Sequence, residues 1–194
     1  MEFFANGKVD RERAFIAANR IGKTLGVGGY ETTLHLTGKY PNWWPGRRFD
    51  KPIRAWAAGK TNETTRDIVQ KVLIGTVRFE NGRRIASGTG LIPGDDLSNF
   101  SWKPGVPDLL DTCLVNHVSG GHSVLGIKTY AQGRGAFEGT EQELIWVDEE
   151  PDMGVYAECL MRTMTVDGMV ICTFTPLEGM SEVVLAFLHP EQLP

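Results

Sequence analysis

The sequence predicts an α/β fold: a three-layer domain in which helices cover both faces of a mostly parallel central sheet. Two observations predict it. Short apolar runs alternate with stretches of helical periodicity, which indicates βα units joined by right-handed crossovers. A length of 194 residues with 41% hydrophobic residues suits one domain of ordinary globular composition. We therefore treat residues 1–194 as a single domain.

The first half of the chain contains two strand–helix pairs separated by an irregular loop. The apolar run at 14–18 predicts the first strand, and a helical pattern follows over 24–36. Residues 40–51 are rich in Pro, Trp and Gly, which predicts a loop. A second apolar run at 53–58 predicts another strand, and the periodicity of 61–73 predicts the helix after it.

The second half alternates less regularly. Asn81-Gly82 is a strong type I′ turn pair and predicts a hairpin over 77–85. Gly120-Gly121 is expected to join two strands, at 114–118 and 123–130. The remaining predicted elements are a buried strand at 144–147, a helix at 156–164, a strand at 170–174 and a helix at 181–188.

Charge and cysteine content exclude several classes of protein. The net charge of −4 argues against a dedicated, tightly binding DNA module, although a local basic patch can still contact phosphates. The three cysteines are scattered and odd in number, so we expect a reducing cytosol rather than a disulfide framework. No run approaches the roughly 18 apolar residues of a membrane span, and no signal-peptide pattern is present. We expect a soluble, intracellular protein without a membrane partner.

Residues 17–24 read A-A-N-R-I-G-K-T, a Walker A phosphate loop with alanine in place of the first glycine. A strand pattern precedes the loop and a helical pattern follows it, as this motif requires. Backbone N–H groups at a helix start form a positive concavity for phosphates. Lys23 is expected to reach the β- and γ-phosphates of ATP, and the Thr24 hydroxyl to bind Mg²⁺. The expected nucleotide-binding residues are Ala17, Ala18, Asn19, Arg20, Ile21, Gly22, Lys23 and Thr24.

A second, partial copy of this motif occurs at Ala58-Gly59-Lys60-Thr61 and also follows a predicted strand. It has Arg54 where the first glycine belongs. We interpret it as a helix start, capped by Thr61 or Asn62.

The run L-I-W-V-D-E-E at 144–150 matches a Walker B motif, in which a buried strand delivers acids to the edge of the sheet. Asp148 is expected to hold the Mg²⁺ shell, and Glu149 to orient and polarise the attacking water. Adjacent strand residues point to opposite faces, so the two acids can serve different roles. Glu150 is an alternative for the water. Together the two motifs specify the fold class as a P-loop NTPase of the ASCE type.

Phosphoryl transfer needs more positive charge than one lysine and one magnesium ion supply, and an arginine often supplies it in cis or in trans. Arg20 lies inside the phosphate loop, and Arg134 lies in a glycine-flanked loop before the acidic strand. Either can be this arginine finger, and a surface loop arginine is the alternative for Arg134. Thr173 and Thr175, at the end of the next strand, can sense the γ-phosphate or simply cap a helix.

These residues resemble the large subunits of tailed-phage terminases, the motors that package DNA. The resemblance spans almost the whole chain and rests on segments in a fixed order. They are FIAANRIGKT with GGYE, YPNWWPGRRF, WAAGKTNETTRD, YAQGRGAFEGTE, LIWVDEEP and TFTPLEGM.

The resemblance implies a role for each matching residue. Lys23 and Thr24 match the Walker A lysine and hydroxyl, and Asp148 and Glu149 match the Walker B pair. Residues 173–176, which include Thr173 and Thr175, match the motif that couples hydrolysis to DNA movement. Arg134 matches the trans finger that reaches the ATP of a neighbouring subunit in a ring.

The sequence departs from the family in two places. The family often has an arginine four residues before the Walker A lysine. Here that position is Asn19 and the arginine is Arg20, which weakens a cis role for Arg20. The adenine-contacting glutamine expected upstream is missing. Either the chain is cut at its N-terminus, or the base stacks on Phe3, Phe4 or Arg11.

The resemblance also bounds what the chain is expected to do. No counterpart of the family's lid subdomain or C-terminal nuclease is expected in 1–194, so no DNA cutting is expected. Implied partners are double-stranded DNA, a homo-oligomeric ring, the portal and the small terminase subunit, in the cytoplasm of a bacterial host. A helicase-like DNA-remodelling ATPase is an alternative, as is a nucleotide-binding or assembly fragment with little turnover alone.

Two further groups of residues have alternative interpretations. Trp43, Trp44 and Phe49, with neighbouring arginines, can contact DNA or a partner, or can fix the 40–51 loop onto the core, which we favour. His117 and His122 flank a Gly-Gly turn, but two candidate ligands without a third are weak evidence for a metal site.

Overall fold

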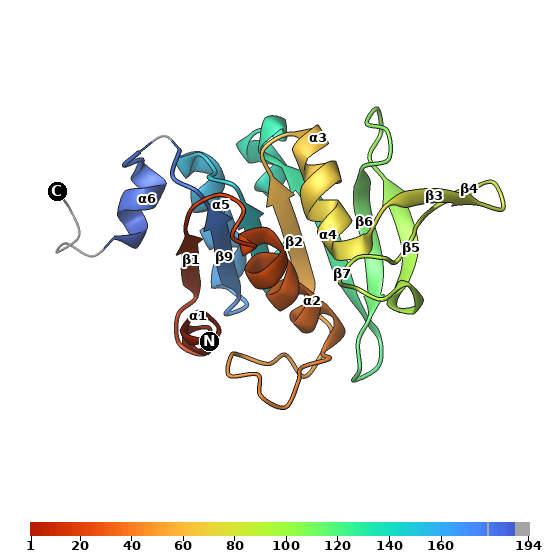
Figure 1. Ribbon diagram of the computed structural model, residues 1–194, viewed down its shortest axis with the longest axis horizontal. Coiled ribbons are helices and arrows are strands. Elements are labelled where there is room, and N and C mark those ends of the chain that lie inside the picture. Colours follow the sequence, from red (N-terminus) through yellow and green to blue (C-terminus); the bar gives the residue numbers. More distant parts are fainter. Residues whose placement is uncertain (178, 189–194) are drawn as a thin grey trace.

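The computed structural model of the chain describes residues 1–177 and 179–188, and one seven-stranded sheet forms its centre. In chain order the strands are β1 (Glu12–Ile16), β2 (Arg54–Gly59), β5 (Leu97–Trp102), β6 (Leu110–Asn116), β7 (His122–Thr129), β8 (Leu144–Asp148) and β9 (Met169–Phe174). Their order across the sheet is β1-β9-β8-β2-β7-β6-β5 (Figure 1). The first five strands in this order, β1, β9, β8, β2 and β7, are parallel to one another. β6 pairs with β7 and β5 pairs with β6, both in antiparallel fashion.

Helical segments form a layer on each face of this sheet. One layer contains η1 (Lys23–Gly29), α2 (Tyr30–Thr37) and the continuous helical stretch of α3 (Asn62–Thr64), η2 (Thr65–Gln70) and α4 (Lys71–Ile74). The other layer contains α5 (Met153–Met164) and α6 (Glu182–Phe187). The three-layer α/β fold predicted from the sequence is therefore confirmed.

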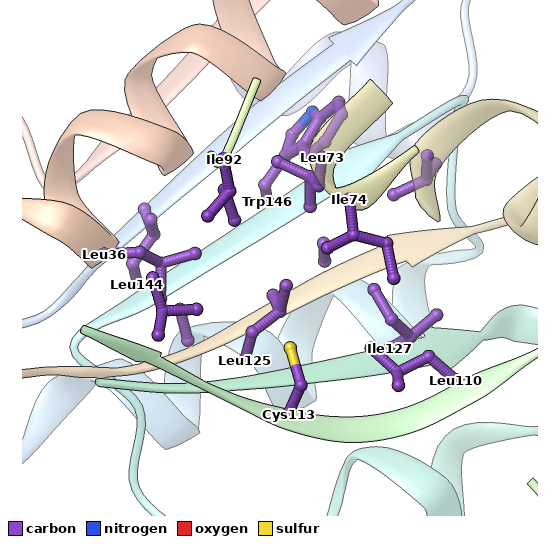
Figure 2. Close-up of a cluster of buried hydrophobic side chains, with 14 of the residues drawn as sticks. Leu36, Leu73, Ile74, Ile92, Leu110, Cys113, Leu125, Ile127, Leu144 and Trp146 are labelled. Atoms are coloured by element: carbon purple, nitrogen blue, oxygen red, sulfur yellow. The ribbon is translucent and has the colours of Figure 1, made fainter. Parts of the chain in front are cut away.

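Each helical layer packs on the sheet through its own hydrophobic cluster. Ala55 and Ala57 of β2 belong to the cluster under α2 and α4, whereas the alternate residues Trp56 and Ala58 belong to the cluster under α5 and α6. This alternation follows from the period of two along a strand. Figure 2 shows the first cluster, where Leu36 and Leu73 descend from the helices onto the strands. A strand buried on both faces reads as a continuous apolar run, which explains why the central strands were readily predicted.

The predicted hairpin is present as β3 (Val77–Glu80) and β4 (Arg83–Ala86), and it projects from the end of the sheet (Figure 1). Asn81 and Gly82 have φ values of 51° and 74°, the positive pair that a type I′ turn requires. Arg84 does not lie free at the tip: its guanidinium lies 5.7 Å from the ring centroid of Trp102.

Two regular elements were not predicted. The short helix α1 (Glu2–Asn6) precedes β1, and β5 pairs with β6 at the edge of the sheet. β5 reads LSNFSW, is mostly polar, and contains Asn99 at φ 54° with register shifts beside it. Such a bulged, half-exposed edge strand lacks the apolar alternation that identifies a strand. Just before it lies the short turn η3 (Gly94–Asp96), whose Asp96 pairs with Lys39 at 2.5 Å.

The aromatic loop 40–51 is fixed to the core by Trp44 and Phe49, two of its four aromatic side chains. Trp44 is 4% exposed and Phe49 is 7% exposed, whereas Trp43 is 54% exposed. The Trp44 indole donates to the Arg47 carbonyl at 2.8 Å, and the Tyr40 hydroxyl accepts from the Phe49 amide at 2.8 Å. The favoured interpretation is therefore correct for Trp44 and Phe49, and Trp43 remains on the surface.

All three cysteines are buried and free, as expected from their number and spacing. Burial raises the pKa of Cys113 and of Cys159 to about 12, and it raises the pKa of Cys172 as well. Within 1–177 and 179–188, no helix is long and apolar enough to cross a membrane.

Candidate nucleotide-binding site

The carboxyl ends of three parallel strands bring the predicted site residues together. β1 leads into the phosphate loop and β8 ends in Asp148, with β9 between them. This edge of a parallel sheet, just beyond the strand ends, is where α/β folds bind ligands. The central position of β9 places Thr173 and Thr175 between the loop and the acids, which their separation in the sequence does not reveal.

Lys23 lies at the centre of the loop and is 8% exposed. Its ammonium donates to the carbonyls of Ala17 and Ala18, at 3.0 and 2.8 Å, and to the Thr175 hydroxyl at 2.8 Å. The loop residues from Ala18 to Gly22 are exposed. The lysine is therefore held inside a loop whose outer surface is open to a ligand.

The backbone of the loop turns sharply at two positions. Arg20 has φ 64° and Gly22 has φ 85°, and Gly22 is the N-cap residue that directly precedes η1. Positive φ is easy for glycine and uncommon for arginine, so the loop holds Arg20 in a conformation that its side chain does not favour. Among the described residues, the Arg20 guanidinium has no ion-pair partner. Its catalytic role stays a prediction.

Asp148 is 4% exposed and accepts hydrogen bonds from two threonines. Thr24 Oγ1 lies 3.0 Å from Asp148 Oδ1, and Thr173 Oγ1 lies 2.7 Å from the same atom. Burial raises the pKa of Asp148 to about 6, although both hydroxyls and the charge of Lys23 act in the opposite direction. A buried carboxylate beside a hydroxyl, with too little positive charge nearby, is a suitable arrangement of oxygen ligands for a divalent cation.

Glu149 departs from the geometry expected of it. β8 ends at Asp148, and Glu149 has φ 66°, so it is not a strand residue and the strand alternation does not set its direction. Its amide donates to the Thr173 carbonyl at 3.0 Å. Glu149 lines a cleft of about 550 Å³ together with Asn19 and Thr175. The left-handed backbone at Glu149, and not the alternation of a strand, therefore sets the directions of the two acidic side chains relative to each other.

Glu150, the alternative acid, contacts the second helical layer. Its carboxylate accepts a hydrogen bond from Ser181, the residue that caps the start of α6. It also lines the cleft.

Thr173 and Thr175 connect the two halves of the site. Thr173 contacts Asp148, and the Thr175 hydroxyl lies 2.8 Å from Lys23 Nζ, from the Ala17 carbonyl oxygen and from Asn19 Oδ1. Because Thr173 lies at the end of β9 and Thr175 directly follows that strand, a shift of β9 displaces the partners of both Lys23 and Asp148.

Sequence reasoning missed two aromatic residues that support the acids. The Trp146 indole donates to Thr173 Oγ1 at 2.8 Å, and the Tyr130 hydroxyl donates to the backbone carbonyls of Asp148 and Glu149. A tryptophan inside an otherwise aliphatic buried strand is a usable signal, because its N–H must find an acceptor in the core. Tyr130 has no comparable signal, because its partners lie on a strand that is not adjacent to its own.

Arg134 lies in the short helical turn η5 (Arg134–Phe137) and pairs with Glu158 of α5, with Nε and Nη2 at 2.8 and 2.5 Å from the same oxygen. The Arg134 side chain is 62% exposed, whereas Glu158 is 3% exposed. Within the described chain it contacts none of the phosphate-loop residues.

The three residues expected to stack on the adenine base each contact other parts of the chain. Arg11 precedes β1 and donates to the Gly168 carbonyl at 3.2 Å, at the amino end of β9. Phe3 packs on Phe15, and Phe4 packs on Trp44 of the aromatic loop. Arg11 therefore serves the opposite edge of the sheet, and the stacking prediction is wrong for Arg11. For Phe3 and Phe4 it stays a prediction.

The second, partial Walker A copy is a helix start, as interpreted. Thr61 caps the helix by accepting from the Thr64 amide at 3.2 Å, in a reciprocal capping box. Lys60 lines the same cleft as Glu149. The two histidines each bond a neighbouring polar side chain, His117 to Ser119 and His122 to Asn116.

Comparisons with known proteins identify the family of the chain. Residues 14–192 match the model of a family described as the N-terminal part of the T4-like-virus-type terminase large subunit. The chain is 38% identical over 204 residues to the terminase large subunit of Salmonella phage P22, a match that covers 96% of this chain and 40% of that protein. A solved mutant of the large terminase ATPase domain of Thermus phage P74-26 is also similar. Its TM-score is 0.44 at 16% identity, over 86% of this chain and 60% of that one. The chain thus spans less than half the length of its P22 relative.

Proposed function

The chain belongs to the terminase large subunit family, and on that premise we propose that it is an ATP-hydrolysing domain that powers the movement of double-stranded DNA into a procapsid. The observation that supports ATP hydrolysis best is the convergence of Lys23, Thr24 and Asp148 at the carboxyl ends of β1 and β8. A phosphate-binding lysine beside a hydroxyl–carboxylate pair is the arrangement that nucleotide hydrolysis requires.

The residues present fit a magnesium ion. Thr24 Oγ1 and Asp148 Oδ1 are oxygen ligands 3.0 Å apart, and a nearby cation would relieve the cost of burying the carboxylate. When bound, Mg²⁺ would neutralise charge on the phosphates of ATP. Asp148 and Thr24 would hold it, directly or through water.

Lys23 and the loop backbone would bind the phosphates. The Lys23 ammonium group lies at the centre of the loop, where it donates to two carbonyls and to Thr175. A phosphate seated on the exposed residues 18–22 would compete with those neutral partners for the ammonium. The amides at the start of η1 would donate to the same group.

Glu149 would orient the water that attacks the γ-phosphorus. Its carboxylate would accept the water proton as the new P–O bond forms and the bond to the ADP oxygen breaks. Thr173 and Thr175 would couple this chemistry to movement, because together they contact Asp148 and Lys23. Arg134 would complete the site of a neighbouring subunit, with Arg20 as the candidate within the same chain.

The wider role follows from the family. We infer a homo-oligomeric ring that acts on double-stranded DNA with the portal and the small terminase subunit, in the cytoplasm of the bacterial host. We infer no DNA cleavage by residues 1–194.

ATP turnover measured across a protein concentration series tests the proposal. Turnover should rise more than linearly with concentration, because a neighbouring subunit completes the site. Lys23→Ala should abolish ATP binding, whereas Glu149→Gln should retain binding and lower turnover by about 100-fold or more. Lys51→Ala, an exposed lysine in the 40–51 loop, is the matched control and should behave as the wild type.

Two outcomes would change the assignment. Undiminished turnover in Lys23→Ala would exclude this loop as the phosphate site. Loss of turnover in Glu150→Gln with retention in Glu149→Gln would transfer the role of orienting the water to Glu150.

A further inference from the structure

Tyr130 makes an unusual contact at the acidic turn. Its hydroxyl lies 2.7 Å from the Asp148 carbonyl oxygen and 3.0 Å from the Glu149 carbonyl oxygen. Both acceptors are backbone atoms, on the two residues that would hold the metal and the water. Burial raises the pKa of Tyr130, so its hydroxyl keeps its proton and acts as the donor.

Tyr130 reaches this turn from two strands away. It directly follows β7 and opens the short turn η4 (Tyr130–Gln132), while β2 lies between β7 and β8. The Ala131 amide donates to the Lys60 carbonyl at 3.2 Å, which anchors the segment over the end of β2. The Tyr130 ring packs on Phe137, with centroids 6.3 Å apart. Residues 130 and 131 therefore connect the carboxyl ends of three adjacent strands, β7, β2 and β8.

The turn that Tyr130 contacts needs support. Glu149 has φ 66°, and a non-glycine residue in that region costs about 1 kcal/mol or more unless its surroundings hold it there. The Thr173 carbonyl accepts from the Glu149 amide on one side, and Tyr130 donates to the carbonyls on the other. The direction of the Glu149 side chain follows from this backbone.

We propose that Tyr130 is a positioning residue: its hydroxyl holds the Asp148–Glu149 turn so that Glu149 faces the cleft. This inference rests on the proposed ATPase function. The same segment connects Glu149 to Arg134. Tyr130 and Arg134 both lie in residues 130–137, and Arg134 attaches this segment to α5 through its contact with Glu158. Residues 130–137 thus contact both the acidic turn and α5.

Tyr130→Phe tests the proposal, because it removes the hydroxyl and keeps the ring. Tyr156→Phe is the matched control. Tyr156 lies in the same hydrophobic cluster and its buried hydroxyl also donates one hydrogen bond, but to Glu12 at 2.8 Å, away from the acids. Measurements are kcat and KM for ATP, together with hydrogen–deuterium exchange of residues 130–137 and 148–153.

The expected result is a split between kcat and KM. Tyr130→Phe should lower kcat by about 10- to 100-fold, the usual effect of removing a group that orients a functional residue. Its KM should stay near the wild-type value, because the phosphate loop is untouched. Hydrogen–deuterium exchange should rise in both 130–137 and 148–153 in Tyr130→Phe. In Tyr156→Phe it should rise in neither segment.

Equal kcat in Tyr130→Phe and the wild type would overturn the proposal, as would parallel losses in the two Phe variants, which indicate general loss of packing. The exchange measurement does not depend on turnover. A wild-type chain without hydrolysis would therefore contradict the proposed function, while the exchange data would still decide whether Tyr130 holds the turn.

Discussion

Asp148 shows how the burial of one carboxylate creates a need for positive charge at the site. Its carboxylate has two threonine donors, and its pKa nevertheless rises to about 6 because it is buried. The fold therefore includes a carboxyl group that is mostly neutral below about pH 6 unless a cation binds beside it. Hydroxyl donors are weaker than charged ones, so they offset only part of the cost of burial.

This shift predicts a dependence of stability on pH. A carboxyl whose pKa is higher in the folded than in the unfolded chain stabilises the fold at low pH, and the stabilisation is lost as pH rises from about 4 to about 6. At about 1.4 kcal/mol per pKa unit, the difference from the reference value of 3.8 is worth about 3 kcal/mol. Without Mg²⁺, the stability of Asp148→Asn relative to the wild type should therefore increase by about that amount between pH 4 and pH 7.

Chemical denaturation of both proteins at several pH values measures this difference. Excess Mg²⁺ and nucleotide provide the control, because the bound cation should stabilise the ionised wild-type carboxylate and reduce the difference. Denaturation curves for the two proteins that shift in parallel with pH would show that Asp148 titrates normally.

At the scale of elements, η1 packs on β8 at a point where only glycine fits. A Cβ atom built on Gly28 would lie 2.0 Å from Trp146 Nε1, so the helical backbone rests directly on the indole. The same indole N–H donates to Thr173, which in turn donates to Asp148. The packing of a helix on a strand thus fixes the threonine that orients the acid.

Gly28→Ala should therefore affect both stability and nucleotide affinity. The added methyl must displace Trp146, and overpacking of this kind typically costs about 1–3 kcal/mol. Loss of the Trp146–Thr173 bond should also weaken binding of magnesium and ATP. Gly26→Ala is the control in the same turn, because a Cβ there meets no atom within 4 Å and alanine favours the helix.

Thermal denaturation and nucleotide titration of the two variants provide the measurement. Equal stability of Gly28→Ala and Gly26→Ala would show that Trp146 can move without cost, and that the contact does not orient Thr173.

The elements also show what the sequence could and could not predict. Strands buried on both faces, such as β8 and β9, are apolar runs, and the Asn81-Gly82 turn has a local backbone requirement. These features are visible in a few consecutive residues. β5 is not, because its bulged register depends on pairing with β6.

The same distinction applies to the site. Lys23, Thr24 and Asp148 could be predicted because each belongs to a Walker motif of a few consecutive residues. The structure brings the two motifs together. The contact of Tyr130 with the acidic turn depends on the order of strands in the sheet, which no local pattern specifies. The stacking prediction for Arg11 failed for a related reason: proximity in sequence to the loop does not mean the same edge of the sheet.

At the scale of the whole molecule, the sheet separates two regions. The proposed nucleotide site lies at the carboxyl edge of the parallel strands, and the aromatic loop 40–51 packs against α1, as the contact between Phe4 and Trp44 shows (Figure 1). Arg134 belongs to the carboxyl edge, but its contact is with Glu158 of α5, and its side chain is largely exposed. An exposed arginine held by a buried carboxylate is available to a neighbouring subunit once that single ion pair opens.

If Arg134 acts on the neighbour's nucleotide as proposed, Arg134→Ala should remove the more-than-linear rise of turnover with protein concentration and leave ATP binding unchanged. Arg162→Ala is the matched control. Arg162 lies 3.6 Å from the other oxygen of Glu158 and has no expected role in hydrolysis. Turnover and equilibrium ATP binding, measured across the same concentration range, distinguish the two. Loss of ATP binding in Arg134→Ala would show that Arg134 serves its own site.

The burial of all three thiols has a practical consequence. The thiolate is the form of cysteine that attacks thiol reagents, and Cys113, Cys159 and Cys172 are both inaccessible and disfavoured as thiolates. A cysteine introduced in place of the exposed Glu80, beside the tip of the projecting hairpin, would be the preferred attachment point for a maleimide dye without prior removal of native cysteines. A fluorophore there would rotate with the domain while staying clear of the nucleotide, so single-molecule fluorescence could follow the domain's orientation through successive turnovers.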